Sequence, residues 1–128
     1  MSHTIKNLRE VADMAPKFGY GEVQEARFCW RDLDAEQTGL ALMRVKPGQR
    51  QAFAHKHDEA EEIYVVVGGS GRIKLDDAII DLTPMDAIRI APGVARALEG
   101  GPEGIEYIAF GPHREGDGEI LKDSGFWG

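Results

Sequence analysis

HKHDEAEEIYVVVGGSG, residues 55–71, is the stretch of sequence that decides the fold. His55 and His57 are one residue apart, so in an extended strand both imidazoles point to the same face. Glu62 follows after four residues and opens an apolar run. The run ends at the glycine-rich residues 68–71, which predict a hairpin turn because a strand rather than a helix follows them. The stretch thus predicts neighbouring strands that carry two imidazoles and a carboxylate on one face.

Short apolar segments alternate with turn residues on both sides of this stretch. Turn sequences rich in proline and glycine separate them, such as KPG at 46–48 and APG at 91–93. No helical segment is long enough for the crossovers of a parallel sheet. The pattern predicts a β-sandwich or closed barrel. The expected strands are residues 27–32, 39–45, 53–57, 62–67, 72–75, 79–82, 87–90, 95–99 and 105–110.

The segment before the barrel, residues 1–26, predicts a short helix. Leu8 and Val11 recur at helical spacing, and Asn7 can cap the helix, so we expect it over residues 7–14. The alternative is an irregular arm that lies on the barrel. All 128 residues are expected to form one domain, with the barrel core at about residues 27–110.

The tail after the barrel, residues 111–128, is polar and rich in glycine until Phe126 and Trp127. Because aromatic surface is costly to expose, we expect this pair to pack on its own barrel or on a second copy of the chain.

Composition narrows the functional classes. Hydrophobic residues make up 42% of the chain and charged residues 29%, as in ordinary globular proteins. The net charge of −7 gives no electrostatic reason to bind nucleic acid or an anionic membrane. The single cysteine, Cys29, cannot form an internal disulfide, and no apolar stretch reaches the length of a membrane span. A cytoplasmic protein is expected.

The spacing of the central motif resembles that of the cupin superfamily. It consists of Pro47-Gly48, six residues, His55-Lys56-His57, four residues, Glu62, six residues and Gly69. The first gap is one residue longer than in the family pattern. The resemblance covers roughly residues 27–110 and is closest to small single-domain bacterial cupins of the conserved-barrel type. It implies an all-β fold, the cupin double-stranded β-helix or jelly-roll barrel, with a short N-terminal helix or arm.

The resemblance implies a metal site formed by His55, His57 and Glu62. Such a set suits a divalent transition metal such as zinc, iron, manganese or nickel. Glu62 is preferred to Glu61 because Glu61 has the opposite strand parity and would face away. Tyr64 shares the parity of Glu62 and is expected to line the same cavity and contact substrate.

The second motif of the family departs from its pattern in this chain. Residues 84–96, PMDAIRIAPGVAR, resemble its approach strand and turn, but Arg96 stands where the family has a histidine. Arginine stays protonated and is not a normal metal ligand. Two interpretations are open: Arg96 holds a substrate carboxylate beside a three-ligand metal, or it pairs with Glu62 and no metal binds. His113 is either a substitute ligand at the barrel mouth or a surface histidine.

The first functional hypothesis is therefore a metal-dependent enzyme that acts on a small organic acid or sugar derivative. The alternative is a non-catalytic module that binds a small molecule and has a degenerate metal site. A homodimer is expected from the apolar tail and from the habit of the resembled family.

Overall fold

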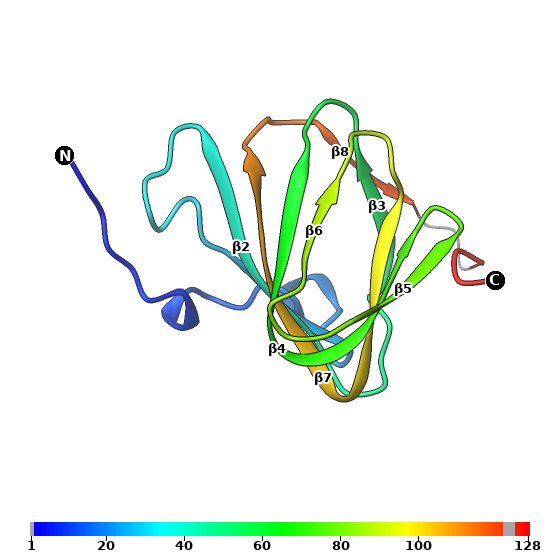
Figure 1. Ribbon diagram of the computed structural model, residues 1–128. Coiled ribbons are helices and arrows are strands. Elements are labelled where there is room, and N and C mark those ends of the chain that lie inside the picture. The colour runs from blue at the N-terminus through cyan, green and yellow to red at the C-terminus, as the bar shows by residue number, and fades with distance from the viewer. Residues whose placement is uncertain (1, 122–124) are drawn as a thin grey trace.

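The computed structural model describes residues 2–121 and 125–128, and this part of the chain is nearly all β (Figure 1). Residues 1 and 122–124 of the expected arm and tail lie outside the described residues. The described strands are β1 (Gln24–Phe28), β2 (Thr38–Val45), β3 (Ala54–His57), β4 (Glu62–Leu75), β5 (Ala78–Leu82), β6 (Ala87–Ile90), β7 (Arg96–Pro112) and β8 (Gly118–Leu121). The all-β fold expected from the sequence is confirmed.

All strand pairings among the described residues are antiparallel, and they form two layers of one curled sheet. One layer has the order β1, β2, β7, β4, β6, and it uses the end of β7 and the start of β4. The other has the order β8, β3, β7, β4, β5, and it uses the start of β7 and the end of β4. The two long strands therefore belong to both layers and join them.

The glycine-rich residues 68–71 do not form the hairpin turn that the sequence predicts. They lie inside β4, which continues through two register irregularities while it pairs with β7. Gly69 has a φ of +67°, and a Cβ added there would collide with the carbonyl oxygen of Gly104. Glycine here permits a bend and a close approach of two backbones rather than a chain reversal. Residues 100–102 likewise lie inside β7, so four expected strands are two long ones.

The hydrophobic core fills the space between the two layers. Its residues alternate along the strands, as expected for side chains that point inward. Ala41, Met43 and Ile88 pack against it while remaining partly exposed. The buried members are Val45, Tyr64, Val66, Ile73, Leu82, Ile90, Leu98, Ile105, Tyr107 and Ala109.

Of the N-terminal helix expected over residues 7–14, only one 3-10 turn is present, Leu8–Glu10, and a second 3-10 turn, Pro16–Phe18, follows beyond that range. Asn7 caps the first turn, since its side chain accepts a hydrogen bond from the Arg9 backbone. The helix stops there because the chain becomes extended to reach β1. Asp13 bridges to Arg27, and its carboxylate accepts from the backbone of Ala26 at 2.8 Å.

The C-terminal aromatic pair packs on the chain's own barrel. The guanidinium of Arg50 lies 4.8 Å from the centre of the Trp127 ring, and the ammonium of Lys74 lies 4.8 Å from that of Phe126. The tail pair is thus held by cation–π contacts. The expected homodimer stays a prediction. Among the described residues, β5 and β8 each pair on one side only, and such edges are the kind that pairing with a second copy covers.

None of the described helical segments is long and apolar enough to cross a membrane.

Replacing Ile73 with alanine tests the packing between the layers. Ile73 is fully buried, so Ile73→Ala should lower the free energy of unfolding by about 2–5 kcal/mol. Ile79, on the neighbouring strand, is 45% exposed, and Ile79→Ala should cost less than about 1 kcal/mol. Urea unfolding measures both values. Equal losses would show that Ile73 does not lie in the core.

Candidate metal centre

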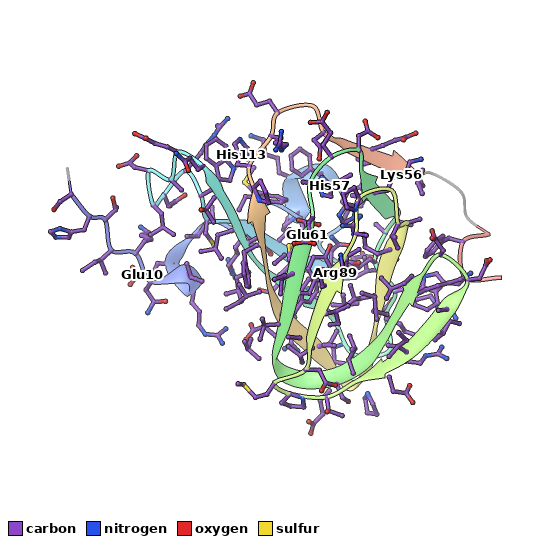
Figure 2. The ribbon with its side chains drawn as sticks, turned by 45° about the horizontal axis from the view of Figure 1, so that its top comes forward. Glu10, Lys56, His57, Glu61, Arg89 and His113 are labelled. Carbon is purple, nitrogen blue, oxygen red and sulfur yellow. The ribbon has the colours of Figure 1, made fainter. Side chains whose placement is uncertain are left out.

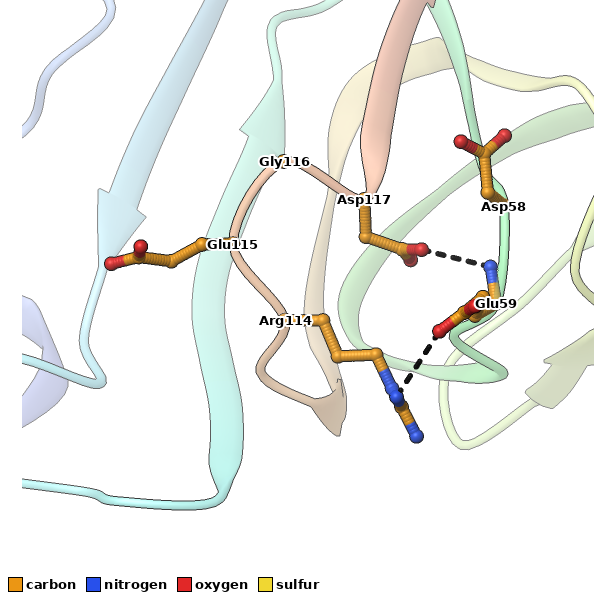
Figure 3. Close-up of a pocket in the computed structure, with 6 residues that line it drawn as sticks. All are labelled: Asp58, Glu59, Arg114, Glu115, Gly116 and Asp117. Carbon is orange, nitrogen blue, oxygen red and sulfur yellow. Dashed lines mark hydrogen bonds and ion pairs between the residues drawn. The ribbon is translucent and has the colours of Figure 1, made fainter.

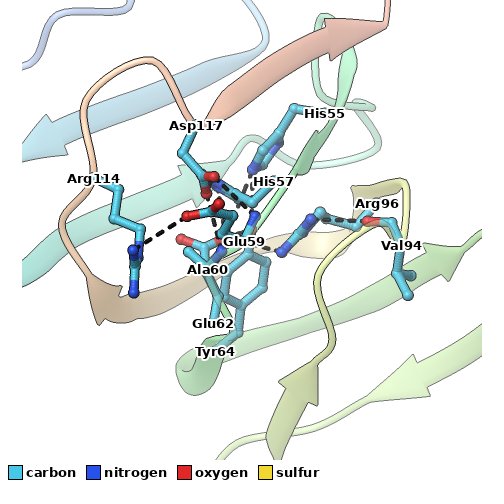
Figure 4. A network of polar contacts seen from close by, with 10 residues as sticks. All are labelled: His55, His57, Glu59, Ala60, Glu62, Tyr64, Val94, Arg96, Arg114 and Asp117. Atoms are coloured by element: carbon cyan, nitrogen blue, oxygen red, sulfur yellow. Dashed lines mark hydrogen bonds and ion pairs between the residues drawn. The ribbon is translucent and has the colours of Figure 1, made fainter.

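One carboxylate oxygen, Oε1 of Glu62, is the meeting point of the site (Figure 4). Nη2 of Arg96 lies 3.1 Å from it, and Nε2 of His57 lies 3.2 Å from it. The hydroxyl of Tyr64 donates to the same oxygen at 3.3 Å. Nε2 of His55 is more distant, at 3.8 Å. The structure thus brings together all five residues that the sequence predicted for the site.

Three strands position these side chains. His55 and His57 lie on β3 with Lys56 between them, and Lys56 pairs outward with Glu119 at 3.5 Å. Arg96 is the first residue of β7 and is the register partner of His55. Its side chain therefore lies on the same face as the two imidazoles. Glu62 is the first residue of β4 and lies in the facing layer. It therefore contacts groups from the layer that holds β3 and the start of β7.

Burial differs sharply between the members of the site. The side chain of Arg96 is fully buried, whereas those of His55, His57 and Glu62 are 26%, 21% and 18% exposed. The guanidinium therefore lies behind the carboxylate, and the imidazoles remain within reach of solvent. An ion from solution can approach the two imidazoles and the carboxylate without passing Arg96.

The donor set fits a metal ion. One ligand atom from each of His55, His57 and Glu62 lies within 4.8 Å of the other two. Two imidazoles and a carboxylate suit a divalent transition metal with open positions. Arg96 opposes such an ion, but a second carboxylate, Asp117, lies behind His57. When both imidazoles are neutral, as metal binding requires, the two carboxylates outweigh the one guanidinium, so in that state the site has one negative charge and attracts a cation.

Asp117 was not found from the sequence. It is the last residue of the β7–β8 loop and its side chain is 94% buried, since only 6% of it is exposed. Its carboxylate accepts from the backbone of Glu59 at 2.8 Å and of Ala60 at 3.0 Å, and lies 3.3 Å from Nδ1 of His57. A single aspartate in a glycine-rich tail carries no pattern that distinguishes it from an ordinary turn residue, so no sequence signal could have identified it.

The environment shifts the pKa values of the titratable groups. Burial alone would raise the pKa of Glu62, but the adjacent rings of His55 and His57 outweigh it and bring the pKa well below its usual range. The pKa of His57 is raised, chiefly because the carboxylate of Glu62 lies against its ring. The pKa of His55 is lowered, chiefly by burial. The metal-free site therefore favours an ionised Glu62 and a charged His57.

Two other candidates, His113 and Glu61, lie outside this cluster. His113 stacks on Trp30 with ring centres 3.9 Å apart and is not among the clustered ligands, so the surface interpretation fits it better than that of a substitute ligand (Figure 2). Glu61 points away from Glu62 and pairs with Arg89 at 3.0 Å. Tyr64 is 2% exposed, so its hydroxyl supports Glu62 from within the core.

An open pocket of about 400 Å³ adjoins the site on the outer side of Asp117 (Figure 3). Its lining comes from the β3–β4 and β7–β8 loops and is mostly acidic, with one guanidinium, Arg114, that pairs with Glu59 at 3.2 Å. The lining residues are Asp58, Glu59, Arg114, Glu115, Gly116 and Asp117. Asp117 thus separates this pocket from the ring of His57.

Residues 41–101 match the sequence model of the Cupin domain family. A cupin protein of Bacteroides fragilis shares the fold, with a TM-score of 0.70 and 20% identity over 91% of this chain and 88% of that one. A putative sugar phosphate isomerase of Acidithiobacillus ferrooxidans has a TM-score of 0.65 and 16% sequence identity, over 80% of this chain and 78% of that one.

A variant of the oxalate decarboxylase of Bacillus subtilis gives a TM-score of 0.77 and 23% identity, over 96% of this chain but only 33% of that one. No curated protein matches the sequence. At sequence identities this low, the structural similarity establishes the fold and nothing more. The fold alone does not determine the reaction.

The raised pKa of His57 gives a test by pH. A group whose pKa is raised by folding stabilises the protein fully below its unfolded pKa, about 6.5, and loses that contribution as the pH rises through the folded value. In the presence of chelator, His57→Gln should therefore cost more stability at about pH 6 than at about pH 9. Urea unfolding at both pH values measures this. The matched control is His113→Gln, and the same pH difference in both variants would contradict the prediction.

Proposed function

Because the chain is a small protein with the cupin fold, we propose that it binds a divalent transition metal through His55, His57 and Glu62 and presents it to a small organic anion. The observation that carries the proposal is the convergence of three ligand atoms within 4.8 Å of one another on partly exposed side chains. When bound, such a metal supplies a Lewis acid that polarises a substrate oxygen.

Charge supports an anionic substrate. Glu62 and Asp117 together offset a divalent ion, and the guanidinium of Arg96 then leaves the site with one positive charge. Arg96 acts from a fixed place, since its Nη2 bonds Glu62 and its Nη1 donates to the carbonyl of Val94 at 2.8 Å. Its buried Nε lacks a hydrogen-bond partner among the described residues.

The inner faces of the edge strands favour an organic acid over a sugar. Phe28 is the register partner of Ala41, an inward-facing residue, and Ile120 is the register partner of His55. Both apolar side chains therefore belong to the inner faces of the two layers, yet they are 46% and 51% exposed. An exposed apolar side chain opposite His55, that of Ile120, suits a molecule with an apolar part. The similar structures include oxalate decarboxylases, named for an organic acid, and sugar phosphate isomerases, so their names alone do not separate the two classes.

The alternative function is a metal-free module that binds a small molecule. The contact between Arg96 and Glu62, at 3.1 Å with a fully buried guanidinium, favours this alternative, because Glu62 already has a cationic partner. Metal binding distinguishes the two functions directly.

Calorimetric titration of zinc or nickel into chelator-stripped protein should give one bound ion per chain. His55→Ala and Glu62→Ala each remove one of three ligands and should weaken binding at least about tenfold, or 1.4 kcal/mol. His113→Ala, the matched control outside the cluster, should bind like the parent. A parent chain that takes up no metal would overturn the proposal in favour of the metal-free module.

Arg96→His should bind zinc or nickel at least about tenfold more tightly than the parent. The substitution removes the opposing charge and places an imidazole opposite His55 in the strand register. Arg96→Met removes the charge without adding a ligand and serves as the control. Binding by Arg96→His that is no tighter than by Arg96→Met would show that residue 96 does not stand at a ligand position.

A further inference from the structure

We propose that Asp117 is a positioning residue, which holds the Nδ1 side of the His57 ring and thereby makes Nε2 the atom that His57 offers to a metal. This inference rests on the proposed function, because it concerns which of the two His57 nitrogens, Nδ1 or Nε2, would bind the metal. Asp117 lies 60 residues from His57 in sequence and reaches it only through the β7–β8 loop.

The backbone of the neighbouring loop fixes the carboxylate of Asp117. Oδ1 accepts from the amide of Glu59 at 2.8 Å, and Oδ2 accepts from the amide of Ala60 at 3.0 Å (Figure 4). The carbonyl of Asp117 also accepts from the amide of Asp58 at 3.0 Å. With both oxygens engaged by amides and the side chain almost fully buried, the carboxylate cannot turn away from the ring beside it.

The fixed carboxylate favours a proton on Nδ1 of the ring. Oδ2 lies 3.3 Å from Nδ1 of His57, but off the line of the N–H bond, so the contact is electrostatic and not a well-aligned hydrogen bond. A lone pair on Nδ1 would face the negative oxygen and be repelled, whereas an N–H there is attracted. Nε2 faces Oε1 of Glu62 in the same way, at 3.2 Å, so the metal-free ring favours a proton on both nitrogens. A metal bound beside Glu62 would displace the Nε2 proton, and Asp117 would keep the remaining proton at Nδ1. A carboxylate behind a ligating histidine orients the ring and increases its basicity.

An asparagine at position 117 would not reproduce this arrangement. The amide side chain has one acceptor oxygen and one amino group, while Asp117 faces three donors: two backbone amides and the imidazole Nδ1. At least one of these three donors would then face the side-chain amino group of the asparagine, which cannot accept its hydrogen bond. Asp58 gives the matched control, since it lines the same pocket and carries the same charge, but its carboxylate contacts no imidazole among the described residues.

The experiment compares the parent chain, Asp117→Asn and Asp58→Asn by two measurements. In zinc titrations, Asp117→Asn should bind at least about tenfold more weakly than the parent, and Asp58→Asn should bind within about twofold of it. In nitrogen-15 spectra of the imidazole rings of zinc-loaded parent protein, His57 should be bound through Nε2 and protonated at Nδ1. A ring bound through Nδ1, or equal zinc affinities in the two variants, would overturn the proposal.

A third measurement needs no metal. In mildly acidic solution with chelator, where the ring carries both protons, the Nδ1 proton of His57 should give a slowly exchanging signal in the parent and in Asp58→Asn. Asp117→Asn should lose that signal while keeping the folded spectrum of the rest of the chain. Its persistence in Asp117→Asn would count against the role of Asp117. If the parent chain shows the signal but binds no zinc, the proposed metal function is refuted. The role of Asp117 in fixing the Nδ1 proton of His57 would still stand.

Discussion

A single oxygen atom, Oε1 of Glu62, connects both layers of this barrel. It receives a guanidinium from β7, a hydroxyl from β4 and an imidazole from β3, all within 3.3 Å. An ionised carboxylate this deep in a protein is stable only when cations or hydrogen-bond donors surround it. The site therefore depends on Glu62 remaining charged, and its other members are arranged around that charge. Removing any donor would leave a partly buried carboxylate undersatisfied.

The long strands explain how three sequence-distant segments reach one oxygen. β4 carries Glu62 at its start and β7 carries Arg96 at its start, and each strand crosses from one layer to the other. Because they run antiparallel and bend together at the glycines, the two starting residues face each other across the barrel. Glycine at 69 is a requirement of this bend, since any larger residue would force the backbones apart. The bend in the core thus determines the geometry of the site.

The sequence predicted the site better than it predicted the strand boundaries. Strand parity and the resemblance to a known motif were enough to place His55, His57, Glu62, Tyr64 and Arg96 together, because alternation fixes which face each side chain takes. The glycine-rich residues 68–71 predict a turn but lie within a strand, since a bulged strand and a hairpin use the same residue types.

Two other features could not be predicted, because they depend on contacts between distant segments. The pairing of residue 13 with β1 overrode the helical spacing of residues 8 and 11. Asp117 and β8 acquire their roles only when the loop returns to the edge of β3. Local pattern carries no trace of such long-range pairing.

Asp117 also explains how one site can accommodate both a proton and a metal. His57 lies between two carboxylates, with Nδ1 facing Asp117 and Nε2 facing Glu62. When the ring is doubly protonated, it and Arg96 balance the two carboxylates, and the metal-free site is neutral. If a metal were held at Nε2, His57 would give up one of these protons and the site would become positive. Proton and metal would therefore compete for the same nitrogen, and metal uptake would release a proton. Under the proposed function, the site would therefore attract an anion only when the metal is bound.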